Sequence, residues 1–134
     1  AFEYVSYDNR VVNTLRSSIR KLGMWGDDIG LVLDLFHLYR SGEEVDVIPE
    51  GMFNRLWVFH VNDAPKIPVD KLVDFDRVFP FDGVANPEKY LSELRNRGFK
   101  GPVSVELVNR QYWDMDEDQV IGKARQSLKK LNIA

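Results

Sequence analysis

The chain has 134 residues with no cysteine, and 18 basic against 21 acidic residues give it a net charge of −3. This length, close to the modal domain size of roughly 100–150 residues, predicts a single domain over residues 1–134. The lack of cysteine excludes disulfides, thiolate catalysis and Cys-ligated metal sites, and the acidic balance disfavours nucleic acid as a partner. No apolar run approaches the roughly 18–20 residues that span a bilayer, so we expect a cytoplasmic protein without a membrane partner.

Strand-sized runs of apolar, β-branched and aromatic residues occur at four places: Phe2–Val5, Ile29–Leu33, Leu56–Val61 and Val103–Val108. Each is nearly continuously apolar, which is typical of strands covered on both faces. Because the chain opens inside the first of these runs, we expect it to be a fragment of a longer polypeptide.

Helical patterns cover three segments: residues 11–22, 87–97 and 116–131. The second has a clear beginning, because Asn86 is a good N-cap and Pro87 suits the first helical position. Ser41–Phe53 permits at most a short helix, and Asp63–Gly83 is long, irregular and interrupted by proline. Loops of that length are usually functional or mobile.

The alternation of strands and helices predicts an α/β fold with a parallel sheet and right-handed crossovers. At roughly 30 residues for each strand–helix unit, the chain holds about four units. A closed (β/α)₈ barrel needs about 250 residues. The chain is therefore either half of such a barrel or a small open α/β sheet.

An ionisable residue lies at or near the C-terminal end of each predicted strand: Glu3, Asp34, His60 and Glu106. Ligands and catalytic groups gather at this edge of parallel sheets. Burying the four groups separately would cost several kcal/mol each, about the desolvation penalty of unpaired charges. Each could instead have its own hydrogen-bond partner, but four such residues in register favour one shared divalent metal.

Several segments together resemble the xylose isomerase-like TIM barrel superfamily of sugar isomerases and epimerases, and within it the inosose (2-keto-myo-inositol) isomerases. They are Ala1-Phe2-Glu3-Tyr4, Leu33-Asp34-Leu35-Phe36-His37, Phe59-His60-Val61-Asn62-Asp63 and Ser104-Val105-Glu106-Leu107. The resemblance covers almost the whole chain and implies the C-terminal half, units 5–8, of a TIM barrel.

By this resemblance, Glu3, Asp34, His60 and Glu106 hold one divalent metal (Mn, Zn, Mg or Co). The resemblance also makes Glu3 and Glu106 the catalytic acid–base pair. In the family, such a pair moves a proton between adjacent carbons through an enediolate-type intermediate. A metal suits this chemistry because the oxyanion that develops beside a weakly acidic C–H needs an electrophile.

Other residues are candidates for substrate binding. His37 resembles the family histidine that contacts substrate oxygens, and Lys66 stands near the position where related epimerases carry an arginine. Arg77 is either a ligand for a substrate hydroxyl or carboxylate, or a surface salt bridge. For Asp63 two interpretations stay open: it orients the His60 imidazole, or it caps the turn that follows.

The leading interpretation is a metal-dependent sugar or cyclitol isomerase or epimerase of carbohydrate or inositol metabolism, inactive as this fragment. One alternative is a non-catalytic half-barrel that binds metal or dimerises. Another is a phosphodiesterase of the endonuclease IV type, which the two histidines and the net charge of −3 disfavour. A half-barrel has open edges, so we expect either a homo-oligomer or a missing N-terminal half.

Overall fold

The computed structural model describes residues 1–132, which form one four-stranded parallel sheet with the order β1-β2-β3-β4. The strands are β1 (Phe2–Glu3), β2 (Leu31–Asp34), β3 (Leu56–Val61) and β4 (Val103–Val105). Neighbouring strands follow one another in the chain and pair in parallel, so each connection is a crossover. The predicted α/β class with parallel strand–helix units is confirmed.

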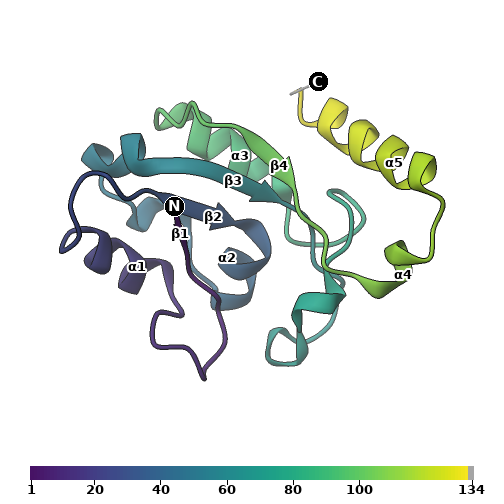
Figure 1. Cartoon of the computed structure of the whole chain (residues 1–134), viewed down its shortest axis with the longest axis horizontal. Coiled ribbons are helices and arrows are strands. Elements are labelled where there is room, and N and C mark those ends of the chain that lie inside the picture. The colour runs from purple at the N-terminus through teal and green to yellow at the C-terminus, as the bar shows by residue number, and fades with distance from the viewer. Residues whose placement is uncertain (133–134) are drawn as a thin grey trace.

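Within residues 1–132, five α-helices accompany the sheet: α1 (Leu15–Leu22), α2 (Leu35–Ser41), α3 (Pro87–Asn96), α4 (Arg110–Trp113) and α5 (Glu117–Lys130). Short 3₁₀ segments add η1 (Val45–Val47), η2 (Glu50–Arg55), η3 (Val69–Lys71) and η4 (Asp74–Asp76). Helix α3 begins at Pro87 behind the Asn86 cap, as predicted. Helix α1 begins four residues later than expected because Thr14 and Ser17 form a capping box there. Figure 1 shows α5 at the opposite end of the molecule from α1.

Helix α2 was not among the predicted elements. Asp34 ends β2, and its side chain accepts a hydrogen bond from the backbone N–H of His37 at 3.0 Å. This N-cap lets the helix start at the next residue without an intervening loop. The same carboxylate therefore ends a strand, caps a helix and stands at the edge of the sheet where ligands bind in parallel folds.

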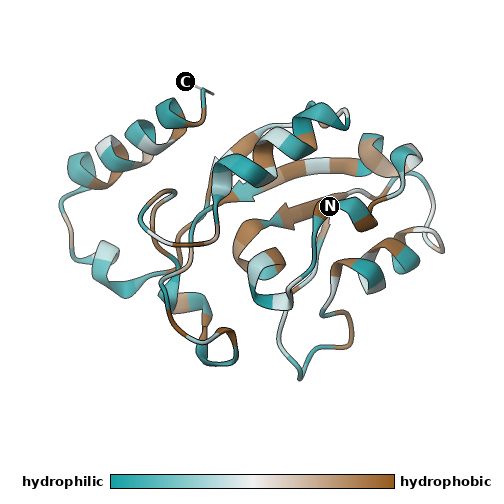
Figure 2. Ribbon diagram, turned by 180° about the vertical axis from the view of Figure 1, so that it is seen from behind, coloured by the Kyte–Doolittle hydropathy of each residue, from teal (hydrophilic) through white to brown (hydrophobic). Residues whose placement is uncertain are grey.

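The hydrophobic core lies between the sheet and helices α1 to α3, with fully buried side chains such as Leu15, Leu33, Phe36, Phe59 and Leu94. Figure 2 shows the apolar colour concentrated along the strands. Apart from Trp57, the large hydrophobic side chains that remain exposed lie outside the strands. Examples are Trp113, 63% exposed, and Ile121, 65% exposed. Among residues 1–132, no helix is both long and apolar enough to cross a membrane.

The loop after β3 folds around the buried carboxylate of Asp63. This carboxylate accepts hydrogen bonds from the backbone N–H groups of Ala64, Phe81 and Ala85 at 2.9, 3.0 and 2.7 Å. A carboxylate held by several backbone donors fixes the path of the chain around it. Asp63 thus caps this loop, which was one of its two open interpretations.

Gly83 lies against this carboxylate with no room for a side chain. A Cβ placed there would lie 2.2 Å from the carbonyl oxygen of Ala64 and 2.7 Å from Asp63 Oδ1. We expect Gly83→Ala to lower the free energy of unfolding by about 1–3 kcal/mol, the usual cost of overpacking. Urea unfolding followed by circular dichroism would measure this change.

Gly122→Ala is the matched control, because this glycine is in helix α5 and a Cβ there meets nothing within 4 Å. Alanine at that position should stabilise the helix by about 0.5–1 kcal/mol through backbone entropy alone. Equal stability changes in the two variants would contradict the close approach at Gly83.

Candidate metal centre

Four ionisable side chains meet at the C-terminal edge of the sheet. Glu3 ends β1 and Asp34 ends β2, while His60 lies one residue before the end of β3 and Glu106 directly follows β4. Asp34 and His60 are register partners across β2 and β3. One potential ligand atom from each of the four residues lies within 4.8 Å of every other. The structure brings together all four residues that the sequence proposed as metal ligands.

The imidazole of His60 lies between the two glutamates. Its Nδ1 is 3.4 Å from Glu3 Oε1 and 3.4 Å from Glu106 Oε2. Neither contact has hydrogen-bond geometry, so Nδ1 is buried without a hydrogen-bond partner within residues 1–132. A buried ring nitrogen that faces two carboxylates without a hydrogen bond is the arrangement expected at a cation site.

The electrostatics of the four groups depend on one another. Without a metal, contact with Glu106 and Glu3 raises the pKa of His60 to about 10. His60 in turn lowers the pKa of Glu106, while burial raises the pKa of Asp34. A divalent cation would reverse the shift at His60, because coordination requires the neutral imidazole and favours ionised carboxylates.

The residues present fit a divalent cation by their chemistry. Three carboxylates and one imidazole offer oxygen and nitrogen ligands suited to Zn²⁺, Mn²⁺ or Mg²⁺. The glutamates remain accessible, with side-chain exposures of 28% for Glu3 and 36% for Glu106, whereas the Asp34 side chain is fully buried. The exposed side of the cluster leaves an approach for a substrate.

A second layer of polar residues lies beside Asp34. Arg77 is buried, with its Nη1 2.8 Å from Asp74 Oδ1 and its Nη2 3.1 Å from His37 Nε2 and 3.6 Å from Asp34 Oδ1. Arg77 therefore forms a buried ion pair, not the surface salt bridge that was one of its interpretations. Its Nε is buried without a partner in the described part of the chain.

Both ring nitrogens of His37 have polar neighbours. A guanidinium only donates hydrogen bonds, so Nε2 accepts from Arg77, while Nδ1 lies 3.1 Å from Ser6 Oγ and 3.4 Å from the Ser6 backbone nitrogen. Burial, followed by the charge of Arg77, lowers the pKa of His37 to about 4 and keeps the ring neutral. Both ring nitrogens are engaged, so a substrate contact at His37 would have to replace one of these bonds.

A cavity of about 210 Å³ opens over this cluster. Its lining consists of Glu3, Val5, His37, Asp74, Arg77, Glu106 and Val108. Two of the predicted substrate contacts, His37 and Arg77, therefore face the same space as the two glutamates. The third, Lys66, lies exposed on the loop after β3 and is not part of this lining.

Sequence reasoning missed two residues near the site, Asn62 and Asp74. Asn62 donates from Nδ2 to Asp34 Oδ2 at 2.8 Å. The available signal was strand periodicity, since residues 60 and 62 of an extended segment point to the same face. Asp74 begins η4, a single 3₁₀ turn in the long loop after β3, which is too short to show a periodic pattern.

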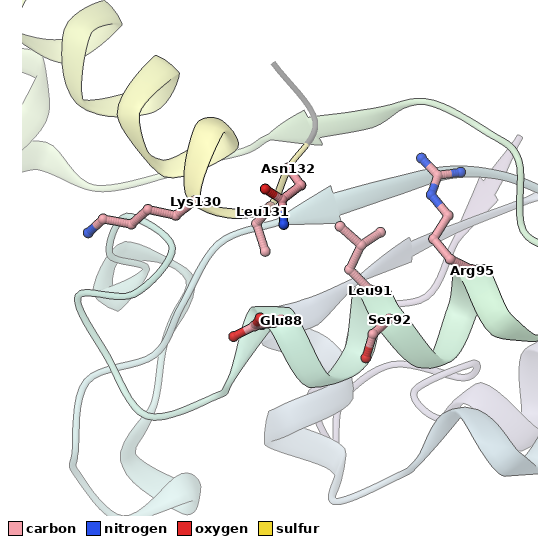
Figure 3. A pocket seen from close by; sticks show the side chains of 7 residues that line it. All are labelled: Glu88, Leu91, Ser92, Arg95, Lys130, Leu131 and Asn132. Carbon is pink, nitrogen blue, oxygen red and sulfur yellow. The ribbon is translucent and has the colours of Figure 1, made fainter.

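A second hollow, of about 240 Å³, lies between α3 and the end of α5 (Figure 3). Two of its residues already have partners, because Arg95 donates to the carbonyls of Phe99 and Gly101, and Lys130 lies over the ring of Phe81. Within residues 1–132, the cluster of Glu3, Asp34, His60 and Glu106 is the group that could hold a metal. The candidate metal-binding residues therefore lie at the C-terminal edge of the sheet and not in this second hollow.

Comparison with known proteins agrees with this architecture. Residues 1–131 match the xylose isomerase-like TIM barrel family. The chain belongs to this family. It is 32% identical over 126 residues to an inosose isomerase of Halalkalibacterium halodurans, covering 93% of this chain and 45% of that protein. It is 30% identical over 128 residues to the inosose isomerase of Bacillus subtilis, covering 95% of this chain and 46% of that protein.

Solved structures of the family superpose closely on the chain. A crystal structure of the IolI protein with a bound zinc atom aligns with a TM-score of 0.89 and 29% identity, over 98% of this chain and 48% of that one. A xylose isomerase domain protein from Salmonella typhimurium shares the fold, with a TM-score of 0.85 at 17% identity. The chain spans about half the length of the curated relatives it matches. It is therefore a half-barrel and not a small open sheet of another fold.

Proposed function

We propose that this half-barrel supplies the metal centre and the acid–base pair of a divalent-metal-dependent sugar or cyclitol isomerase. The observation that carries the proposal is the placement of Glu3 and Glu106 around His60, whose Nδ1 has no hydrogen-bond partner within residues 1–132. The inosose isomerase relatives and the zinc in the IolI structure support the substrate class and the metal.

In this proposal Glu3, Asp34, His60 and Glu106 hold the cation. When bound, the cation polarises a substrate carbonyl and stabilises the negative charge that develops on its oxygen. Glu3 and Glu106 come from the two edge strands of the sheet, β1 and β4, so they approach a substrate from different sides. One carboxylate removes a proton from the hydroxyl-bearing carbon beside the carbonyl, and the other returns a proton to the former carbonyl carbon. The proton of the hydroxyl group passes to the former carbonyl oxygen, so the carbonyl moves by one carbon with no net change in protons.

The charge of the pocket favours a neutral substrate. Four carboxylates face the site, from Glu3, Asp34, Asp74 and Glu106, against the single guanidinium of Arg77. With a divalent cation bound, this half of the pocket stays negative and repels phosphate or carboxylate groups. A sugar or cyclitol whose hydroxyls bond to carboxylates and to Arg77 meets these conditions.

Zinc titration of the 134-residue chain tests the metal centre. We expect one Zn²⁺ per chain, with an affinity that rises about tenfold per pH unit near pH 8 and more steeply towards pH 6. The metal displaces one proton from His60, whose pKa in the metal-free chain is about 10, and at the lower pH a second from Asp34, whose pKa burial raises to about 7. Isothermal titration calorimetry in buffers of different ionisation enthalpy would measure both the affinity and the released proton.

His60→Ala should abolish tight binding in this titration, because it removes the nitrogen ligand. The exposed Lys66→Ala is the control, since Lys66 lies outside the pocket lining and should leave the affinity unchanged. Zinc bound equally well by the His60 variant, or a complete absence of binding by the wild-type chain, would overturn the proposed centre.

A further inference from the structure

We propose that Asn62 is a positioning residue that orients the Asp34 carboxylate toward the metal centre; this rests on the proposed function. Asn62 directly follows β3 and its side chain is completely buried. Its Nδ2 donates to Asp34 Oδ2 at 2.8 Å and makes a longer bond of 3.4 Å to the backbone oxygen of Glu106. One amide thus joins the ends of three neighbouring strands that each carry a proposed ligand.

The two oxygens of Asp34 are held by different donors. Oδ1 accepts from the backbone N–H of His37 at 3.0 Å, and Oδ2 accepts from Asn62. Two bonds to two oxygens fix the plane of the carboxylate, and each oxygen keeps a lone pair for a cation. The first bond belongs to the cap of α2 and depends only on the backbone. Arg77 Nη2 lies 3.6 Å from Oδ1, beyond hydrogen-bond distance, so Asn62 is the side chain whose hydrogen bond limits rotation of the carboxylate.

The orientation of the amide itself follows from the same contact. Asn62 Oδ1 is buried without a hydrogen-bond partner in the part of the chain that the structure describes. If the amide were turned over, Oδ1 would face Asp34 Oδ2, and two acceptors would repel each other at hydrogen-bond distance. A buried carbonyl without a hydrogen-bond partner lowers the stability of the folded chain. The hydrogen bond that the NH₂ group of the same amide donates to Asp34 offsets this cost and explains why an amide is present at this position.

Cobalt binding to the 134-residue chain tests the role of Asn62, because the visible absorption of Co²⁺ reports the geometry of its ligands. Asn62→Leu keeps the branched shape and the number of heavy atoms of the side chain and removes the donor. We expect Co²⁺ to bind about 10–100-fold more weakly, as is typical when a partner of a metal ligand is lost. We also expect the absorption bands to change in position or intensity, which loss of stability alone would not produce.

Asn109→Leu is the matched control. Asn109 is also buried, but its hydrogen bonds go to the backbone oxygen of Arg77 at 2.8 Å and to the backbone N–H of Gln111, and not to any of the four proposed ligands. This variant should bind Co²⁺ within about twofold of wild type and with the wild-type spectrum, against the 10–100-fold loss expected at Asn62. Equal affinities and spectra in wild type and the Asn62 variant would overturn the inference while leaving the proposed metal centre intact.

A measurement on the metal-free wild-type chain separates the two proposals and does not depend on folding of the Asn62 variant. In the NMR spectrum, the Asn62 side-chain amide should show one slowly exchanging proton, shifted by its bond to Asp34. Asp34→Ala should remove this shift and speed the exchange, whereas the Asn109 amide should not change. If the wild-type chain binds no Co²⁺, the proposed metal centre fails. An Asn62 amide that exchanges rapidly, or that is insensitive to Asp34, contradicts the inference itself.

Discussion

Exchange of Glu106 for glutamine is expected to lower isomerase turnover by about 10²–10⁴-fold, the usual contribution of a general base. Glutamine keeps an oxygen that can face a metal but cannot accept a proton, so metal binding should be largely retained. The assay requires a closed barrel, for example this chain joined to the half of the Bacillus subtilis inosose isomerase that it does not match. Steady-state kinetics with an inosose, combined with zinc analysis of the same samples, would separate loss of the base from loss of the metal.

Glu88→Gln is the control for this exchange, because Glu88 is exposed in the first turn of α3 and lies outside the lining over the metal cluster. Its turnover should equal that of the parent. A Glu106 variant that retains turnover within a fewfold of the parent would remove Glu106 from the acid–base role. A variant that loses both zinc and turnover would assign Glu106 to metal binding without showing that it acts as a base.

The 134-residue chain alone is expected to bind metal yet show no measurable isomerase turnover. All four proposed ligands belong to this chain, but the metal cluster is open on one side, with the Glu106 side chain 36% exposed. Water therefore reaches the reacting groups, and the electrostatic stabilisation of a developing oxyanion is weakened. A closed barrel would supply the loops that exclude water and contact the far side of the substrate.

The test compares the isomerase turnover of the chain alone with that of the same chain in a closed barrel, at equal zinc occupancy. The difference measures what the other half of the barrel contributes to turnover. Light scattering in parallel identifies any self-association. The half-buried Val58 and Val105 on the strands, together with the exposed Trp113 at the end of α4 and Ile121 on α5, offer apolar surface for it. Turnover by a metal-loaded monomer of this chain at the rate of the closed barrel would show that this half of the site is sufficient.

Much of this architecture is encoded locally and was predictable from the sequence. Parallel strands covered by helices need continuous apolar runs, and such runs placed all four strands, although β1 and β4 proved shorter than expected. The Asn86-Pro87 pair marked the start of α3 because capping depends on a few adjacent residues. The ionisable residues at the strand ends were recognisable because every parallel strand delivers its C-terminal residue to the same edge.

Tertiary structure alone decided what surrounds those residues. Helix α2 could not be separated from β2 by pattern, because Asp34 ends the strand and caps the helix with one side chain. Arg77 and Asp74 come from an irregular loop without periodicity, and their place beside His37 depends on how Asp63 and Gly83 fold that loop. Local patterns thus determined which side chains reach the edge of the sheet. Long-range contacts determined which of them are buried, paired and oriented, because hydrogen bonds between distant segments exist only once the chain has packed.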